Sequence, residues 1–120
     1  MKILNLEKQP KVALKTPNSI RVVELSDVLY VKANNNYVVV RLDNGVEILM
    51  TDTLKRMEAD LNEYGFVRCH KSYLVNIFCL QEIKGNKIPS VIVSHDLVLP
   101  ASKEGIKRIK DAFELLATPL

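Results

Sequence analysis

The feature of this chain that most restricts its fold is a series of short strand-forming runs, each interrupted by residues that favour turns. Between residues 11 and 50, apolar and β-branched runs are separated by Pro17-Asn18, by Asn34–Asn36 and by Asp43–Gly45. Asn and Gly adopt the left-handed backbone conformation at low cost, so these stretches predict tight connections between strands. Similar runs follow residue 65. We therefore expect a mainly β domain with roughly eight to ten short strands.

Two segments have the periodicity of a helix instead. In residues 53–64 the apolar side chains share one helical face and lie at Leu54, Met57, Leu61 and Tyr64. Asp52 is expected to cap the start of this helix, and Gly65 to follow its end. The second helix is expected over residues 102–117, with Ser102 as its cap. Its expected apolar face consists of Ile106, Ile109, Phe113 and Leu116.

Length and composition limit what the chain can do. The 120 residues, 48% of them apolar, suffice for one domain with a core, and we expect residues 1–11 to be an arm or linker and residues 12–117 to be the domain. A net charge of +3 permits a polyanionic partner without requiring one. The sequence has no zinc-ligand spacing, signal sequence or apolar stretch of membrane-spanning length. We expect a cytoplasmic protein without a metal or cofactor.

The sequence offers no catalytic set. Cys69 and His70 are neighbours in an expected strand, so their side chains point to opposite faces and cannot act as a pair. None of the common nucleophile, zinc-protease or phosphate-loop motifs is present, and an enzyme is not expected. A thiol sensor is one alternative, because basic neighbours could lower the pKa of Cys69. The other interpretation makes Cys69 a small strand residue that packs inward.

Three polar segments remain as candidates for binding. They are Asn34–Asn36 with Tyr37, the cluster Arg68–Ser72, and the basic residues of the last helix. Each has an ordinary explanation as a turn, a hairpin end or a solvated helix face. Together, on a small β scaffold without a catalytic set, they favour binding of an anionic partner.

The chain resembles the LytTR family of bacterial DNA-binding domains, which are usually the output half of two-component response regulators. The resemblance covers about residues 12–116 and is carried by VxLSDVLYVKANNNYVVV, DNG, TLKRMEADL, FVRCHKSYLVN and LPASK, of which FVRCHKSYLVN is the most specific. It implies an elongated arrangement of small antiparallel sheets with two short helices. It also implies that loops, rather than a recognition helix, enter two successive major grooves and the minor groove between them.

The resemblance also assigns roles to residues. The first major-groove loop corresponds to Asn34, Asn35, Asn36 and Tyr37. The middle contact falls on His70, Lys71 and Ser72, where we expect Arg68 to give support from the strand through a salt bridge. The second major-groove loop corresponds to Ala101, Ser102, Lys103 and Glu104. Glu104 departs from the family, in which a basic residue is common hereabouts.

The implied partner is double-stranded DNA, with two copies of the domain bound to direct repeats. A sensor kinase and receiver domain, or a membrane-protein regulator, are further partners that the family implies. A protein–protein module that binds an acidic partner through the same basic loops remains the alternative, because basic, polar loops serve both purposes. Dependence of binding on salt and on DNA sequence would separate the two.

Overall fold

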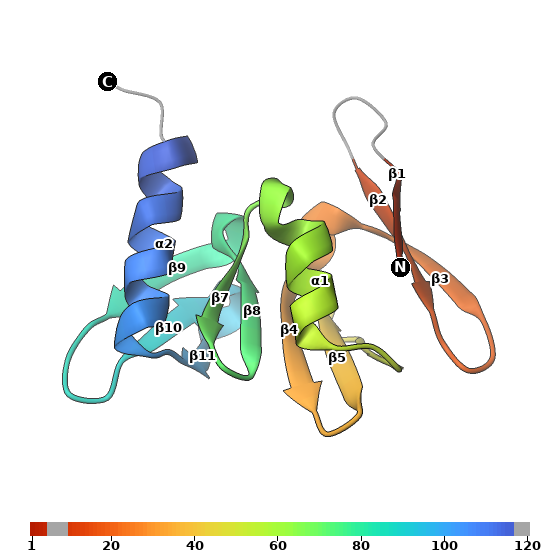
Figure 1. The fold of residues 1–120 in the computed structure, drawn as a ribbon, viewed down its shortest axis with the longest axis horizontal. Coiled ribbons are helices and arrows are strands. Elements are labelled where there is room, and N and C mark those ends of the chain that lie inside the picture. Colours follow the sequence, from red (N-terminus) through yellow and green to blue (C-terminus); the bar gives the residue numbers. More distant parts are fainter. Residues whose placement is uncertain (5–9, 117–120) are drawn as a thin grey trace.

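Two three-stranded sheets flank a five-stranded sheet in the computed structural model of the protein, which describes residues 1–4 and 10–116 (Figure 1). The central sheet is antiparallel, in the order β6-β5-β4-β8-β7. Its strands are β4 (Val28–Asn34), β5 (Tyr37–Leu42), β6 (Glu47–Met50), β7 (Phe66–His70) and β8 (Tyr73–Asn76). The chain measures 42 × 34 × 25 Å along its principal axes.

The two smaller sheets are also antiparallel, in the orders β1-β2-β3 and β11-β10-β9. The first comprises β1 (Lys2–Leu4), β2 (Lys11–Lys15) and β3 (Ile20–Glu24). The second comprises β9 (Leu80–Lys84), β10 (Ser90–Val93) and β11 (Leu97–Pro100). Four 3-10 turns complete the described part: η1 (Leu25–Asp27), η2 (Asn62–Tyr64), η3 (Ile77–Cys79) and η4 (Ser94–Asp96). The described ranges therefore hold eleven strands, against an expectation of eight to ten, and the mainly β fold is confirmed.

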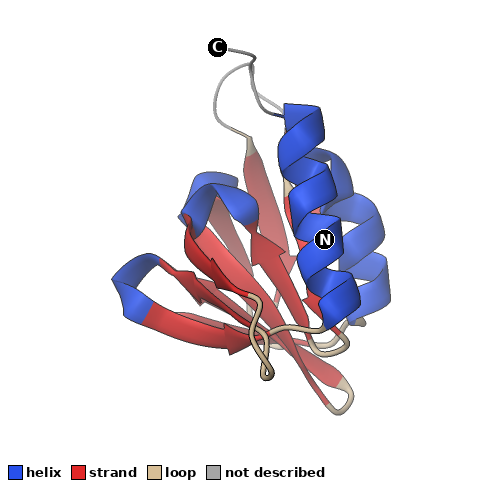
Figure 2. Ribbon diagram, turned by 90° about the vertical axis from the view of Figure 1, so that its left-hand side faces the viewer, coloured by secondary structure: helices blue, strands red, loops and turns tan. Residues whose placement is uncertain are grey.

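Within the central sheet, β8 is buried on both faces, which is why it is rich in apolar residues, whereas β6 is buried on one face only. On β8, Leu74 belongs to a core shared with β2 and α1 (Leu54–Leu61), whereas its neighbour Val75 belongs to a core shared with β10, β11 and α2 (Lys103–Leu116). Side chains alternate along a strand, so two successive apolar residues serve two separate cores. Figure 2 shows α1 and α2 together at one side of the molecule, although they pack against opposite faces of β8. In Figure 1, β7 lies between these helices.

The helices agree with the sequence pattern except at particular ends. Leu54, Met57 and Leu61 are buried, and Tyr64 packs against the same core from η2. The cap prediction was wrong by one residue: Thr53, not Asp52, is the N-cap, and its Oγ1 accepts a hydrogen bond from the Arg56 N–H. Asp52 instead accepts from the N–H of Thr53, whose extended backbone places the first helical turn one residue later.

Gly65 has a φ of +87° and ends η2, as expected of a glycine after a helix. In α2, Ile106 and Ile109 are buried, but Phe113 is 42% exposed, because the helix is longer than the part of it that packs against the core. Residue 117, the last residue of the expected second helix, lies outside the described residues.

Part of the N-terminal segment that the sequence suggested as an arm forms a strand. Lys2–Leu4 pairs in an antiparallel register with Lys11–Ala13. Residues 5–9 lie outside the described residues. In the described ranges, no helix has the length and apolar character that crossing a membrane requires.

Candidate nucleic-acid interface

The two polar turns that the sequence singled out and the start of α2, which carries Ser102 and Lys103, lie along one edge of the molecule. Figure 1 shows the β4–β5 turn, the β7–β8 turn and the N-terminal end of α2 at the lower edge of the view, and Figure 2 agrees. The strand order explains this: β4 and β8 are adjacent and antiparallel, so the turn that follows β4 and the turn that precedes β8 meet at the same end of the sheet. β11 then brings the start of α2 to that end.

The β4–β5 turn presents Asn34–Asn36 and Tyr37 to solvent. Asn34 pairs with Tyr37 as the last register pair of the hairpin, and Asn35 has a φ of +54°. Asn tolerates this left-handed conformation, which confirms the turn prediction. All four side chains are exposed, Tyr37 by 44%. The turn therefore offers amide donors and acceptors together with an aromatic ring.

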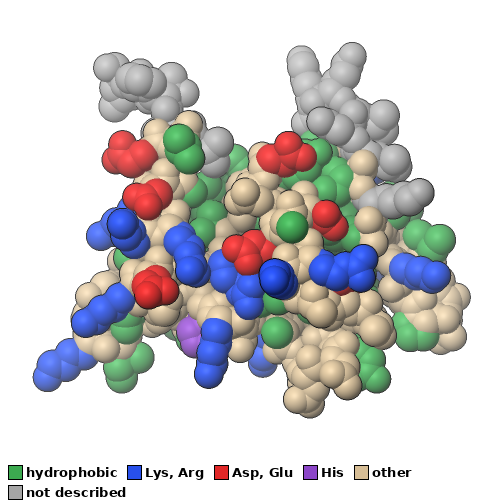
Figure 3. Space-filling model, viewed as in Figure 1, with side chains coloured by type: hydrophobic (Ala, Val, Ile, Leu, Met, Phe, Trp, Pro, Cys, Tyr) green, Lys and Arg blue, Asp and Glu red, His purple; other side chains and the backbone are tan. Residues whose placement is uncertain are grey.

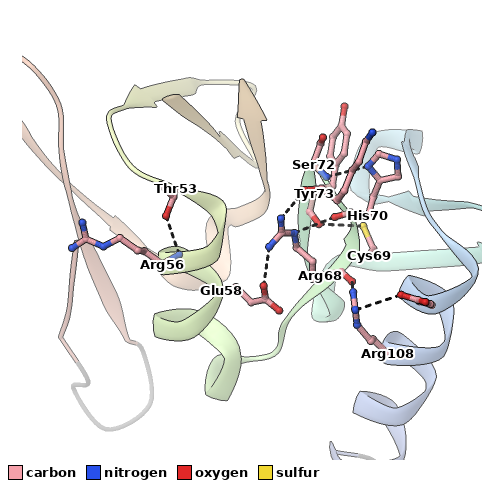
Figure 4. Close-up of polar contacts among 11 residues, drawn as sticks. Thr53, Arg56, Glu58, Arg68, Cys69, His70, Ser72, Tyr73 and Arg108 are labelled. Atoms are coloured by element: carbon pink, nitrogen blue, oxygen red, sulfur yellow. Dashed lines mark hydrogen bonds and ion pairs between the residues drawn. The ribbon is translucent and has the colours of Figure 1, made fainter. Parts of the chain in front are cut away.

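The β7–β8 turn is held from inside by Arg68 (Figure 4). Its Nε donates to the carbonyl oxygen of His70 at 3.2 Å, and its Nη2 donates to that of Lys71 at 2.7 Å. Its Nη1 donates to Oε1 of Glu58 on α1 at 2.9 Å, which confirms the expected salt bridge. The Arg68 side chain is 21% exposed. One guanidinium thus joins the turn to α1, and most of its donors are already engaged.

His70 and Ser72 are bonded to each other within this turn. Nδ1 of His70 accepts a hydrogen bond from the Ser72 N–H at 3.1 Å, so this nitrogen carries no hydrogen and the neutral ring carries it on Nε2. The edge of the imidazole lies against Tyr73, with ring centroids 5.9 Å apart. Nε2 remains as a donor, and the Lys71 side chain is exposed.

The start of α2 is anchored on the backbone of β7. The Ser102 N–H donates to the carbonyl oxygen of Cys69 at 2.9 Å. The Ser102 Oγ accepts from the Gly105 N–H at 2.8 Å, which confirms its capping role and leaves its hydroxyl hydrogen available. Lys103 is exposed, whereas Ala101 is buried and belongs to the core.

Gly105 allows this close approach. A Cβ built there would lie 1.9 Å from the carbonyl oxygen of Cys69, a backbone atom that cannot move aside. The Arg108 Nη1 adds a hydrogen bond to the carbonyl oxygen of Arg68 at 3.3 Å. The position of the helix relative to the β7–β8 turn therefore depends on direct contact between backbones.

A groove of about 500 Å³ separates the β7–β8 turn from α2. Its lining is strongly charged and consists of Glu58, Arg68, His70, Lys71, Ser102, Glu104 and Arg108. A second groove of about 500 Å³ joins the β4–β5 turn to the start of α1, where it is lined by Asn35, Asn36 and Tyr37 together with Lys55 and Arg56. In Figure 3, Lys and Arg side chains spread across this face, below most of the Asp and Glu side chains. The arrangement suits an extended anion better than a small substrate.

The structure contradicts the thiol-sensor interpretation. Cys69 is completely buried, and desolvation raises the pKa of its thiol to about 12 although Arg68 is adjacent. The thiol is therefore protonated at neutral pH and inaccessible. Within residues 1–4 and 10–116, no three His, Cys, Asp or Glu side chains are grouped so that they could hold a metal ion.

Sequence reasoning missed several residues near this edge. Lys32 lies across from Tyr73 in the β4–β8 register, and its Nζ is 5.8 Å from the centre of that ring. Lys55 and Arg56 line the groove beside the β4–β5 turn. Helical spacing could have indicated Lys55 and Arg56, which lie in the first turn of α1. Nothing in the sequence pairs Lys32 with Tyr73, because β4 and β8 are distant along the chain.

Comparison with known proteins identifies similar sequences and a similar fold. The chain is 32% identical over 98 residues to the transcriptional regulatory protein BtsR of Escherichia coli K12, and the match covers 80% of this chain and 40% of BtsR. It is 30% identical over 105 residues to the sensory transduction protein LytT of Bacillus subtilis, covering 85% of this chain and 43% of LytT. The chain thus spans less than half the length of these relatives.

The solved structure of a LytTr DNA-binding domain from Bacillus cereus superposes with a TM-score of 0.70 at 23% identity, covering 90% of this chain and 97% of that one. This likeness confirms the fold. The family model of the LytTr DNA-binding domain matches residues 18–114. A match to a DNA-binding domain family is typical of a binding domain and not of an enzyme. This protein belongs to the LytTr DNA-binding domain family.

Proposed function

We propose that this domain binds double-stranded DNA sequence-specifically, as the DNA-binding part of a bacterial transcription regulator that acts in the cytoplasm. The observation that carries the proposal is that three exposed polar segments from distant parts of the chain share one edge of the molecule. Contacts spread along an edge suit a duplex, whose grooves alternate along its length. The names of BtsR and LytT, a transcriptional regulatory and a sensory transduction protein, support the same role.

The two outer segments read sequence in successive major grooves. Asn34, Asn35 and Asn36 offer amides, which bind adenine through N6 and N7, and Tyr37 adds a ring and a hydroxyl. Ser102 and Lys103 enter the next major groove from the start of α2. The Ser102 hydroxyl keeps its hydrogen, because its oxygen is the acceptor in the helix cap.

The middle segment positions the protein on the backbone across the minor groove. Lys71 and Ser72 bind phosphate or sugar of the DNA backbone. The Nε2–H of His70 is a further hydrogen-bond donor toward the same DNA backbone. Arg68 acts through this turn rather than on DNA directly, because its donors bind His70, Lys71 and Glu58. Arg68 is therefore a positioning residue.

Two copies of the domain bind direct repeats, and the repeats lie about one or two helical turns apart. Control comes from a receiver domain with its sensor kinase, or from a membrane protein that sequesters the regulator.

Selection of bound sequences from a random double-stranded pool at near-physiological salt tests the proposal. A motif repeated head-to-tail is the expected result. Retention without a motif that vanishes as salt rises would contradict sequence-specific binding and favour an acidic protein partner, since a basic surface alone binds polyanions in this way.

A further inference from the structure

We propose that Glu104 determines specificity by accepting a hydrogen bond from the amino group of a cytosine in the second major groove. The inference rests on the proposed function and deepens it, because Glu104 lies beside the two residues assigned to that groove, Ser102 and Lys103. Glu104 is an acidic residue on a basic surface, and the inference names cytosine as the base that it contacts.

The structure leaves the carboxylate of Glu104 facing outward and available. Glu104 is the second residue of α2, and its side chain is 86% exposed. Its Oε2 lies 3.8 Å from Nη2 of Arg108, one helical turn later, which is too long for a strong hydrogen bond. It also lines the groove between the β7–β8 turn and α2, so it occupies the DNA-facing edge.

Electrostatics limits what an acidic group can contact at this edge. A carboxylate only accepts hydrogen bonds, and phosphate oxygens repel it. Base edges in the major groove offer it just two donors, the amino groups of cytosine and adenine. Adenine places the N7 acceptor beside its amino group, which repels the second carboxylate oxygen, whereas the major-groove edge of cytosine has no acceptor. Cytosine is therefore the base that this carboxylate favours.

Arg108 makes the arrangement compatible with a nearby phosphate strand. Its guanidinium donates a hydrogen bond to the carbonyl oxygen of Arg68 at 3.3 Å and places a positive charge beside Glu104. At long range, the positive charge of Arg108 cancels the repulsion between the Glu104 carboxylate and phosphate. The carboxylate oxygens still have lone pairs that can accept a hydrogen bond from a base. Glu104 thus selects among bases without preventing the basic residues from binding the backbone.

The test compares sequences selected from one random duplex pool by the wild-type domain, by E104Q, by E104R and by the control E114Q. Glu114 is an exposed residue near the other end of α2, so E114Q makes the same change of charge away from the proposed interface. Circular dichroism melting shows whether each variant is folded. Binding of duplexes that differ at one position then measures the preference as a ratio of affinities.

We expect the wild-type motif to contain a cytosine that is preferred by about tenfold over thymine. The E104Q variant should lose most of that preference and keep the rest of the motif, and E104R should prefer guanine there, since Arg binds guanine O6 and N7. E114Q should select the wild-type motif. An unchanged E104Q motif, with tighter binding to every sequence, would overturn the inference and leave the proposed function intact. If the wild-type domain enriches no motif, the proposed function fails together with the inference.

Discussion

Replacing Arg68 by alanine should loosen the β7–β8 turn and weaken DNA binding without removing a phosphate contact. The side chain donates to two turn carbonyls and to Glu58, and it is mostly buried between them. In R68A, the carbonyl oxygens of His70 and Lys71 lose their charged donor, and α1 loses its link to the turn. Lys71 and Ser72 would then need to be ordered by the DNA, at a cost to affinity.

The structure sets the size of the effect. Hydrogen bonds from a charged group contribute about 1.5–3 kcal/mol each, and the lower value applies here because water can reach the turn. The pair with Glu58, whose side chain is 37% exposed, adds a few tenths of a kcal/mol at most, since solvent screens it. Two such bonds and the pair with Glu58 together predict that R68A lowers the free energy of unfolding by about 3 kcal/mol and the melting temperature by roughly 12 °C.

Two measurements separate positioning from direct contact. Thermal unfolding followed by circular dichroism gives the stability, with R21A, a substitution of an exposed arginine on β3, as the control. Anisotropy titrations of a labelled duplex at several salt concentrations give the slope of log affinity against log salt. R68A should weaken binding with an almost unchanged slope. A slope reduced by about one, with an unchanged melting temperature, would refute the reasoning, because it would show that Arg68 binds a phosphate.

Three further predictions concern the turns and the buried backbone contact. Lys71→Ala should weaken binding to all sequences and reduce the salt slope by about one, whereas Asn36→Ala should relax sequence preference; equal loss of specificity from both would contradict this division of roles. Gly105→Ala should destabilise the fold by about 3 kcal/mol or more in denaturant titrations, because its Cβ would overlap the Cys69 carbonyl, and a near-neutral result would mean that α2 shifts readily. Burial raises the pKa of the Cys69 thiol to about 12, so the folded state holds this proton more tightly than the unfolded state. The free energy of unfolding should therefore fall as the pH rises above about 9. Denaturant midpoints measured over this pH range should show the fall, and Cys69→Ala should flatten it.

The sequence was informative where local rules decide the structure. The Asn34–Asn36 turn, Gly65 after the first helix and the Ser102 cap follow from the backbone preferences and hydrogen-bonding capacity of single residues, and the structure contains all three. The boundary at Thr53 was misplaced by one residue because Asp and Thr are both good caps. Phe113 shares the predicted helical face and is still 42% exposed, because periodicity reveals a helical face but not where the partner surface ends.

What the sequence could not supply were contacts between segments distant along the chain. The pairing of β4 with β8 brings the turns at Asn35 and Lys71 to one edge, and no local signal determines that pairing. The expected salt bridge of Arg68 gained a partner, Glu58, only when α1 and β7 were seen together. The close contact of Gly105 with Cys69 likewise depends on tertiary packing.

The most direct test of the central claim is a titration of the ¹⁵N-labelled domain with the selected duplex, followed by amide chemical shifts. If the shared edge binds DNA, the largest shift changes should occur at residues 34–37, 70–72 and 102–104, and amides of β3, which lies in a separate sheet, should change little. Shift changes that are largest on β3, with residues 34–37, 70–72 and 102–104 unaffected, would contradict the claim that these three segments form the DNA-binding surface.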